Sequence, residues 1–203
     1  ACAPFRRLSL CNKNMVNMIP NNNDGKAKHD LLADVCYAAK FEAESLKTYR
    51  EQYDAEYSSG SGFTLCTMLA RSFADIGDIV RGKDLYLGNK KKKQTERDQL
   101  EGKLQSFFKN IHDNLDDSIK SKYNDDAKKN FYQLREDGWT ANRETVWEAM
   151  TCKAEGAYFH ATCDSGDGKS QYQTHNKCTC NNGDVPTYFD YVPQYLRWFE
   201  EWA

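Results

Sequence analysis

Apolar residues recur at steps of three and four along much of the chain, which is the period of an amphipathic α-helix. Four stretches show this pattern: one that starts at Asp30, then residues 65–82, 100–115 and 127–151. We expect Asp30 to cap the first helix, and Gly138 to kink or briefly break the last one. The pattern therefore predicts an all-α fold.

Between and around these stretches the pattern is lost. Residues 1–27 carry two prolines and a run of turn-forming residues, so they are predicted to form an extended segment and a loop. Residues 58–62 are Ser and Gly only and separate the first two helices. Residues 153–191 are rich in Gly, Asn, Asp, Ser and Thr and are predicted to be mostly loop. Pro193 then opens a short helix, because its missing N–H costs nothing at a helix start.

The composition supports a folded chain that needs no nucleic-acid partner. Of the 203 residues, 39% are hydrophobic and 13% aromatic, which is too much apolar surface for a disordered protein. The formal net charge is −2, so no overall positive field attracts nucleic acid. There is no apolar run of about 18 residues and hence no predicted membrane span. The chain starts without Met and stops inside a helical pattern, so we expect it to be a fragment.

The eight cysteines predict disulfide bonds in an oxidising compartment. They fall into two groups of four, one near each end: Cys2, Cys11, Cys36 and Cys66, then Cys152, Cys163, Cys178 and Cys180. This split predicts two separately cross-linked lobes, with three possible pairings in each. The alternative is a zinc site built from the last cysteines with His160 and His175, but the chain lacks a CxxC motif.

No arrangement of residues predicts catalysis. The string Gly60–Ser61–Gly62 lacks the strand-to-helix context of a nucleophile elbow, and the four histidines are scattered singly. Adjacent acidic pairs such as Asp116–Asp117 are typical of a solvated helix face. We therefore predict no enzyme activity, no cofactor and no bound metal.

A local concentration of positive charge is the remaining candidate for binding. It comprises Arg81, Lys83, Lys90, Lys91, Lys92, Lys93 and Arg97, with Arg6 and Arg7 as a second, smaller group. These side chains could converge on the sulfate or carboxylate groups of a glycan without burying an ammonium group. The alternative is a solvated lysine run at the start of a helix, since charge runs usually face solvent.

Four longer blocks carry a resemblance to a known family. Residues 34–40, 69–88, 130–147 and 185–202 occur in the same order, and closely resemble, the Duffy-binding-like alpha domains of the Plasmodium falciparum erythrocyte membrane protein 1 family. The resemblance implies an all-helical, disulfide-linked adhesion module of three subdomains without enzymatic activity. It places a first subdomain at 1–90, a second at 91–184, and the opening helix of a truncated third at 185–203.

The resemblance also implies a function. Such domains lie on the extracellular face of the infected erythrocyte membrane, undergo antigenic variation and are recognised by antibodies. They bind erythrocyte or endothelial receptors or sulfated glycans such as heparan sulfate, in cytoadhesion and rosetting, usually beside a cysteine-rich interdomain region.

Two departures from the family pattern bear on this function. Gly138 replaces a residue that is more often aromatic, and the window from Asp78 to Pro193 holds four cysteines, as in members less often tied to rosetting. The alternative function is a structural head domain that supports a neighbouring receptor-binding domain and has no receptor of its own.

Overall fold

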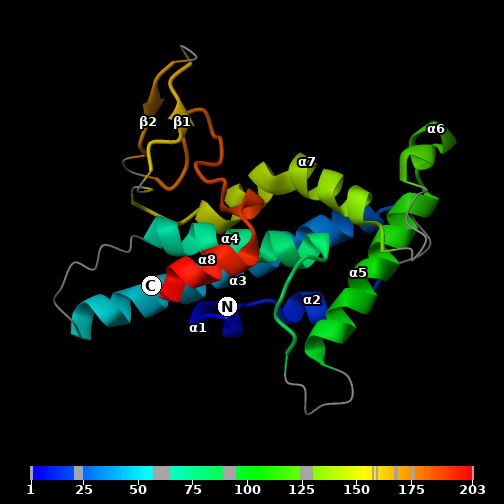
Figure 1. Cartoon of the computed structure of the whole chain (residues 1–203), viewed down its shortest axis with the longest axis horizontal. Helices are drawn as coiled ribbons and strands as arrows, with labels where there is room; N and C mark the ends of the chain where they lie inside the picture. Colours follow the sequence, from blue (N-terminus) through cyan, green and yellow to red (C-terminus); the bar gives the residue numbers. More distant parts are fainter. Residues whose placement is uncertain are drawn as a thin grey trace.

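The computed structural model describes residues 2–20, 25–56, 65–88, 95–123, 130–156, 158, 160–166, 169–174 and 177–202, without the side chains of 53–56. Within these ranges the regular secondary structure is helical apart from one small β-hairpin and an isolated bridge between Glu155 and Lys177, and irregular segments connect the elements (Figure 1). The helices are α1 (Phe5–Leu8), α2 (Lys13–Asn17), α3 (Ala27–Glu56), α4 (Leu65–Arg81), α5 (Glu96–Asp113), α6 (Asp117–Lys120), α7 (Tyr132–Thr151) and α8 (Gln194–Trp202), with 3₁₀ turns η1 (Ser121–Tyr123) and η2 (Phe189–Tyr191). Strands β1 (Cys163–Asp164) and β2 (Gln171–Tyr172) pair antiparallel. The predicted all-α fold is confirmed.

The main differences from the sequence prediction concern helix ends and Gly138. The N-terminal segment, residues 2–20, forms the short helices α1 and α2 rather than an extended loop. Helix α3 begins at Ala27, so Asp30 lies in its first turn and is not its cap. Helix α7 runs unbroken through Gly138, where an added Cβ would be 3.6 Å from Phe108 of α5. Packing against α5 therefore outweighs the low helix propensity of glycine.

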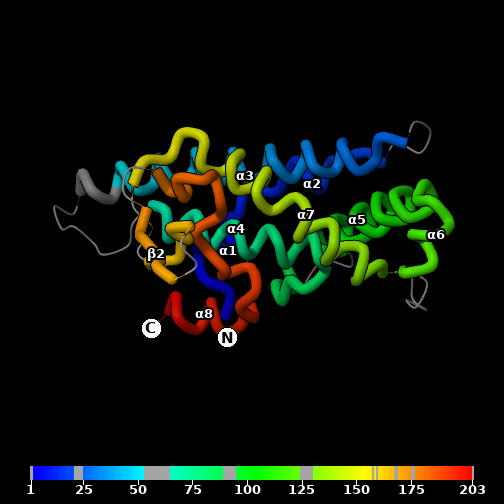
Figure 2. Tube along the Cα trace, turned by 90° about the horizontal axis from the view of Figure 1, so that it is seen from above, coloured from blue at the N-terminus to red at the C-terminus, as the bar shows by residue number. Residues whose placement is uncertain are grey.

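Helix α4 lies in the middle of the molecule, between α3 and α8 (Figure 2). Nearly all of its residues are buried, including charged ones. It packs tightly against α7 at Gly77, where an added Cβ would be 2.7 Å from the indole ring of Trp139. A side chain of any size at position 77 would force the Trp139 ring or the helix backbones to shift.

The hydrophobic core surrounds α4 and is continuous through the molecule. Phe73 of α4 packs with the rings of Trp139 and Trp147, at centroid distances of 5.0 and 5.1 Å. The same cluster of buried residues extends from Leu10 in the N-terminal segment to Val185 near the C-terminus. The subdomain boundaries near 90 and 184 stay a prediction.

The disulfides correct the predicted separation into two cross-linked lobes. Cys66 at the start of α4 is bonded to Cys178, so this bond joins the first cysteine group to the second. Cys163 is bonded to Cys180 and closes the loop that contains the hairpin.

The other four cysteines, Cys2, Cys11, Cys36 and Cys152, are thiols, so the prediction of eight bonded cysteines is wrong for them. The Cys36 sulfur lies 4.0 Å from the Thr145 carbonyl of α7. Cys152 is seven residues, or about two helical turns, beyond Thr145, so Cys36 and Cys152 are too far apart to form a disulfide bond.

Both described ends of the chain lie side by side. The indole of Trp202 donates a hydrogen bond of 2.9 Å to the Cys2 carbonyl, and its ring meets Phe5 edge-on at 5.7 Å. None of the described helices is long and apolar enough to cross a membrane.

Candidate binding surface

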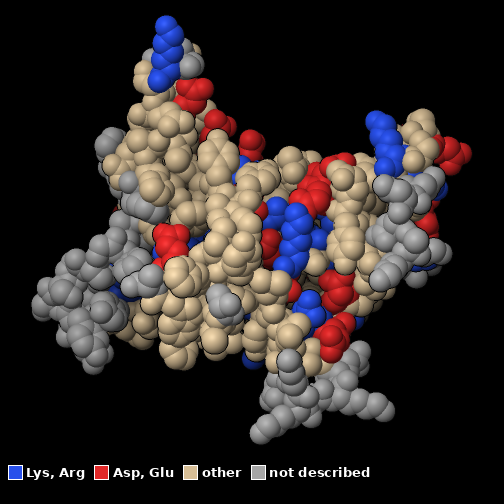
Figure 3. Space-filling model, in the orientation of Figure 1, with Lys and Arg blue, Asp and Glu red and all other residues tan. Residues whose placement is uncertain are grey.

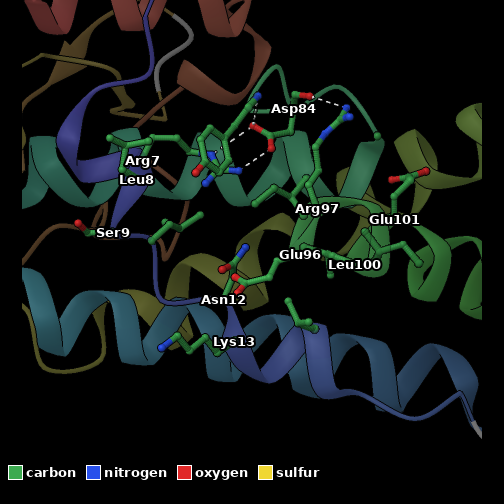
Figure 4. Close-up of a pocket in the computed structure, with 16 residues that line it drawn as sticks. Arg7, Leu8, Ser9, Asn12, Lys13, Asp84, Glu96, Arg97, Leu100 and Glu101 are labelled. Atoms are coloured by element: carbon green, nitrogen blue, oxygen red, sulfur yellow. Dashed lines mark hydrogen bonds and ion pairs between the residues drawn. The ribbon is translucent and has the colours of Figure 1, made fainter. Parts of the chain in front are cut away.

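A cleft of about 360 Å³ opens between the N-terminal segment, the connection after α4 and the first turns of α5 (Figure 4). Its floor is apolar and includes the buried side chains of Ile79, Leu100 and Leu104. Its polar wall and rim include Arg7, Lys13 and Arg97. We refer to this hollow as the cleft.

Two of the predicted basic residues meet at Asp84 in the wall of the cleft. The buried guanidinium of Arg7 donates to the Asp84 carboxylate at 2.5 and 3.2 Å and lies 4.7 Å from the ring centroid of Tyr86. Arg97 donates to the Asp84 backbone carbonyl at 3.1 Å and is only partly buried (Figure 4). Arg7 therefore forms a structural ion pair with Asp84, and its assignment to a glycan site is corrected. Arg97 stays partly exposed at the rim of the cleft and is still a candidate to bind a ligand.

The lysine run, Lys90–Lys93, lies outside the described residues. The residues on either side of it, Gly88 and Thr95, lie close together, since a Cβ at Gly88 would be 3.1 Å from the Thr95 Cβ. Thr95 caps α5 by accepting from the Asp98 N–H while the Asp98 carboxylate accepts from the Thr95 N–H. The two described residues that flank the run thus lie close together at the start of α5, and Thr95 is two positions before Arg97.

Arg81 and Lys83 do not face the cleft. Gly82, Asp84 and Tyr86 line the cleft, whereas Lys83 and Leu85 line a different hollow. This is the side-chain alternation of an extended segment, which sends neighbouring residues to opposite sides.

In that second hollow Arg81 is buried. It donates to the Asp78 carboxylate at 2.8 Å and to the carbonyls of Gly77 and Asp190. Lys83 is exposed but pairs with Glu136. The assignment of Arg81 to a glycan site is therefore wrong, and Lys83 lies on a different side of the chain from Arg97.

Arg6 is also buried, and its guanidinium holds the N-terminal segment to two helices. It donates to Asp75 of α4 at 2.7 Å and to Glu201 of α8 at 2.8 and 3.0 Å. Burial opposes its charge, but the Asp75 and Glu201 carboxylates outweigh burial and raise the pKa of Arg6 above its ordinary value. Arg6 is thus a structural cation and not a glycan ligand, again because burial removes it from solvent.

The visible face of the molecule shows no continuous basic patch. Figure 3 shows Lys and Arg atoms beside Asp and Glu atoms in the middle of this face. Among the described residues there is no group of three or more His, Cys, Asp or Glu side chains placed to hold a metal ion.

The family model of the Duffy binding domain matches residues 1–197. The chain belongs to the Duffy binding domain family. The family and its fold are those of adhesion domains rather than enzymes. No curated protein matches the chain.

Solved Duffy-binding-like domains share the fold over the whole chain. The NTS-DBL1α1 domain of Plasmodium falciparum membrane protein 1 (PfEMP1) from the varO strain is 41% identical, with a TM-score of 0.78, and the match covers all of this chain and 43% of that one. The NTS-DBL1α and CIDRγ double domain of the same strain is 42% identical, with a TM-score of 0.78, and 27% of it is covered. A PfEMP1 DBLβ domain bound to human ICAM-1 is 31% identical, with a TM-score of 0.70 and coverages of 97% and 38%. The chain spans less than half the length of these structures.

Sequence reasoning missed the carboxylates that engage the cations of this Duffy binding domain. Asp84 is 77 residues from its partner Arg7. Glu136 is likewise distant in sequence from its partner Lys83 and meets it only in space. One signal was present: helix α4 places Asp75 and Asp78 on a stretch that is otherwise apolar, and a buried carboxylate needs a cation.

Proposed function

We propose that this Duffy binding domain is an adhesion domain of a variant surface antigen, exposed on the infected erythrocyte. It binds an erythrocyte or endothelial receptor or a sulfated glycan, and its exposed loops vary and are recognised by antibodies. The observation that carries the proposal is the position of Arg97 and Lys13 among the residues that line the cleft, with Arg97 following closely in sequence on the segment that contains Lys90–Lys93. The solved DBLβ domain bound to human ICAM-1 supports a host receptor for the family.

The physical basis is a local concentration of cations in the sequence of a nearly neutral chain. Buried carboxylates already pair with Arg6, Arg7 and Arg81. We therefore assign polyanion binding to the remaining cations: the lysine run, Arg97 and Lys13. Exposed ammonium groups bind sulfate by long-range attraction, which salt screens over about 8–10 Å at physiological ionic strength. Binding by this surface must therefore weaken steeply with salt.

The test is retention on immobilised heparin at increasing salt. The variant Lys90→Glu, Lys91→Glu, Lys92→Glu, Lys93→Glu should elute at clearly lower salt than the parent chain. The matched control makes the same total charge change at four scattered exposed lysines: Lys28, Lys47, Lys122 and Lys177. Equal retention of the lysine-run variant and the parent chain would falsify the assignment of the site.

A second function is favoured by the outer face of α8. Tyr195, Leu196, Phe199 and Trp202 are all substantially exposed there, as expected for a surface that another domain covers. This supports the alternative of a head domain that serves a neighbouring receptor-binding domain, such as the cysteine-rich interdomain region found beside a DBL1α domain in one solved relative. This function predicts no heparin or red-cell binding by the chain alone, and intact receptor binding when the neighbour is joined to it.

A further inference from the structure

Residues 180–184 form a tight turn at the second disulfide, and we refer to them as the Asn-Gly turn. Cys180, its first residue, is bonded to Cys163. The Gly183 N–H donates to the Cys180 carbonyl at 2.9 Å, and the Cys180 N–H donates to the Asp184 carbonyl at 3.2 Å. Residues 181–184 are all exposed. The backbone of the turn is therefore held at both ends, while its side chains meet water.

The Asn-Gly turn contains a reactive pair, Asn182 followed by Gly183, which occurs at no other place in the sequence. The side-chain amide carbon of an asparagine is an electrophile, and the backbone nitrogen of the next residue can reach it and close a ring. A Cβ on the next residue hinders this approach, and glycine has none. Asn181 lies in the same turn but is followed by Asn182, so it lacks this advantage.

Two hydrogen bonds hold the Asn182 side chain over residue 183. The Asp184 N–H donates to Asn182 Oδ1 at 3.2 Å, and Asn182 Nδ2 donates to the Asp184 carboxylate at 2.5 Å. The amide is thus folded along the backbone that contains the Gly183 nitrogen. The N–H at Oδ1 also stabilises the negative charge that develops on this oxygen when its carbon is attacked. The bond from the Gly183 N–H to Cys180 must open first, which costs little in an exposed turn.

We propose that Asn182 is a site of spontaneous deamidation through a cyclic imide with Gly183. The Gly183 nitrogen loses its proton to water and attacks Asn182 Cγ. The new C–N bond forms, the bond from Cγ to Nδ2 breaks, and Nδ2 takes a proton from water and leaves as ammonia. Water then adds to either carbonyl of the imide and opens the ring, which gives aspartate or isoaspartate. The reaction consumes only water and changes no oxidation state.

The product changes the contact that holds the Asn-Gly turn. An amide donates to the Asp184 carboxylate, but an ionised carboxylate at position 182 only accepts, so the two groups repel each other. The turn loses this contact and gains a negative charge, while the Cys163–Cys180 bond keeps it attached to the hairpin. Deamidation therefore alters both the charge and the shape of an exposed loop. No part of this inference depends on binding at the cleft.

The experiment is a time course of the folded chain, with its disulfides intact, in mildly alkaline buffer. Peptide mapping by mass spectrometry locates the conversion of amide to carboxylate, and labelling with an isoaspartyl methyltransferase detects isoaspartate. We expect Asn182 to convert at least about tenfold faster than Asn181, which corresponds to about 1.4 kcal/mol in the barrier. Asn181 is the internal control, because it is exposed in the same turn. Asn182→Gln should remove the isoaspartate signal.

Hydrogen exchange of the Gly183 N–H tests the effect on the turn. Asn182→Asp, which mimics one product, should speed this exchange severalfold. The matched control combines Asn182→Asp with Asp184→Asn, which restores an amide beside a carboxylate and should return exchange toward that of the parent chain. Near-UV circular dichroism checks that each variant is folded, and the time course on the parent chain needs no variant. Two outcomes overturn the proposal: Asn182 converts no faster than Asn181, or folded Asn182→Asp exchanges like the parent chain.

Discussion

The two sides of helix α4 are both buried but are built from opposite chemistry. The side toward α3 and α7 presents Leu69, Phe73 and Ile76, none of which has measurable exposure. The side toward α8 and the N-terminal segment presents Asp75 and Asp78, which are buried to almost the same degree. The comparison separates two tasks of one helix: one side supplies hydrophobic stabilisation, and the other selects which segments can pack there.

The selectivity of the ionic side follows from its partners. Asp75 accepts from Arg6 at 2.7 Å and from Arg197 at 2.8 Å, so a single carboxylate holds both the N-terminal segment and α8. Gln194 at 3.0 Å and the indole of Trp198 at 3.3 Å also donate to it. A buried ion pair adds little over an apolar contact, but removing one partner leaves an uncompensated charge. The apolar side has no such requirement, because apolar side chains of similar volume can replace one another.

The largest effect should therefore come from Asp75→Ala, which leaves the guanidinium groups of Arg6 and Arg197 buried beside each other without their shared carboxylate. We expect a loss of about 3–5 kcal/mol in the free energy of unfolding, measured by urea denaturation.

The matched control is Asp113→Ala, because Asp113 also pairs with a cation, Lys109 at 2.6 Å, but is half exposed. It should cost less than about 1 kcal/mol. Similar losses for the two variants would show that the ionic side of α4 is not a special requirement of the fold.

The same contrast explains what could be predicted from the sequence. The helices α3, α4, α5 and α7 follow from local apolar periodicity, which is the signal that the apolar side of α4 carries. The ionic side could not be predicted, because Asp75 is 69 residues from Arg6 and 122 from Arg197, and no local pattern couples them. The Cys66–Cys178 bond, across 112 residues, escaped for the same reason.

The candidate site was predicted only in part. The cluster of basic residues was identified from the sequence, but charge alone does not show which cations already have carboxylates. Arg97 remains at the rim of the cleft, whereas Arg7 is consumed by Asp84. The extended segment after α4 places Asp84 and Tyr86 in the cleft but Lys83 in the second hollow. A count of charges along the sequence cannot separate these two surfaces.

On the apolar side the limiting factor is space, and Gly77→Ala tests it. The new Cβ would lie 2.7 Å from the Trp139 ring, so the ring or the helices must shift, and we expect a loss of about 1–3 kcal/mol by urea denaturation. The control is Gly102→Ala in α5, where a Cβ meets no atom within 4 Å. That variant should gain up to about 1 kcal/mol from helix propensity. A neutral Gly77→Ala would mean that the contact between α4 and α7 is looser than the structure shows.

The smallest effect should appear in the pH dependence of stability, where Asp75 contrasts with a second buried carboxylate, Glu42 of α3. Burial raises the pKa of Asp75, but Arg6 and Arg197 outweigh it, so the folded pKa is below the ordinary value. Burial also raises the pKa of Glu42, and there the bonds from Ser72 and the Cys11 N–H do not compensate, so the folded pKa stays above the ordinary value. The two groups must therefore affect stability with opposite signs.

Asp75 stabilises the fold above its unfolded pKa of about 3.9, and this contribution is lost as pH falls through its lower folded pKa. Glu42 binds its proton more tightly in the folded state, so its contribution is present below about pH 4.3 and is lost as pH rises through the folded pKa. Urea denaturation across this acidic range should show Asp75→Asn becoming more destabilising with rising pH, and Glu42→Gln becoming relatively more stable. Parallel profiles for the two variants would contradict the assignment, since they would mean that both carboxylates are equally well compensated by cations.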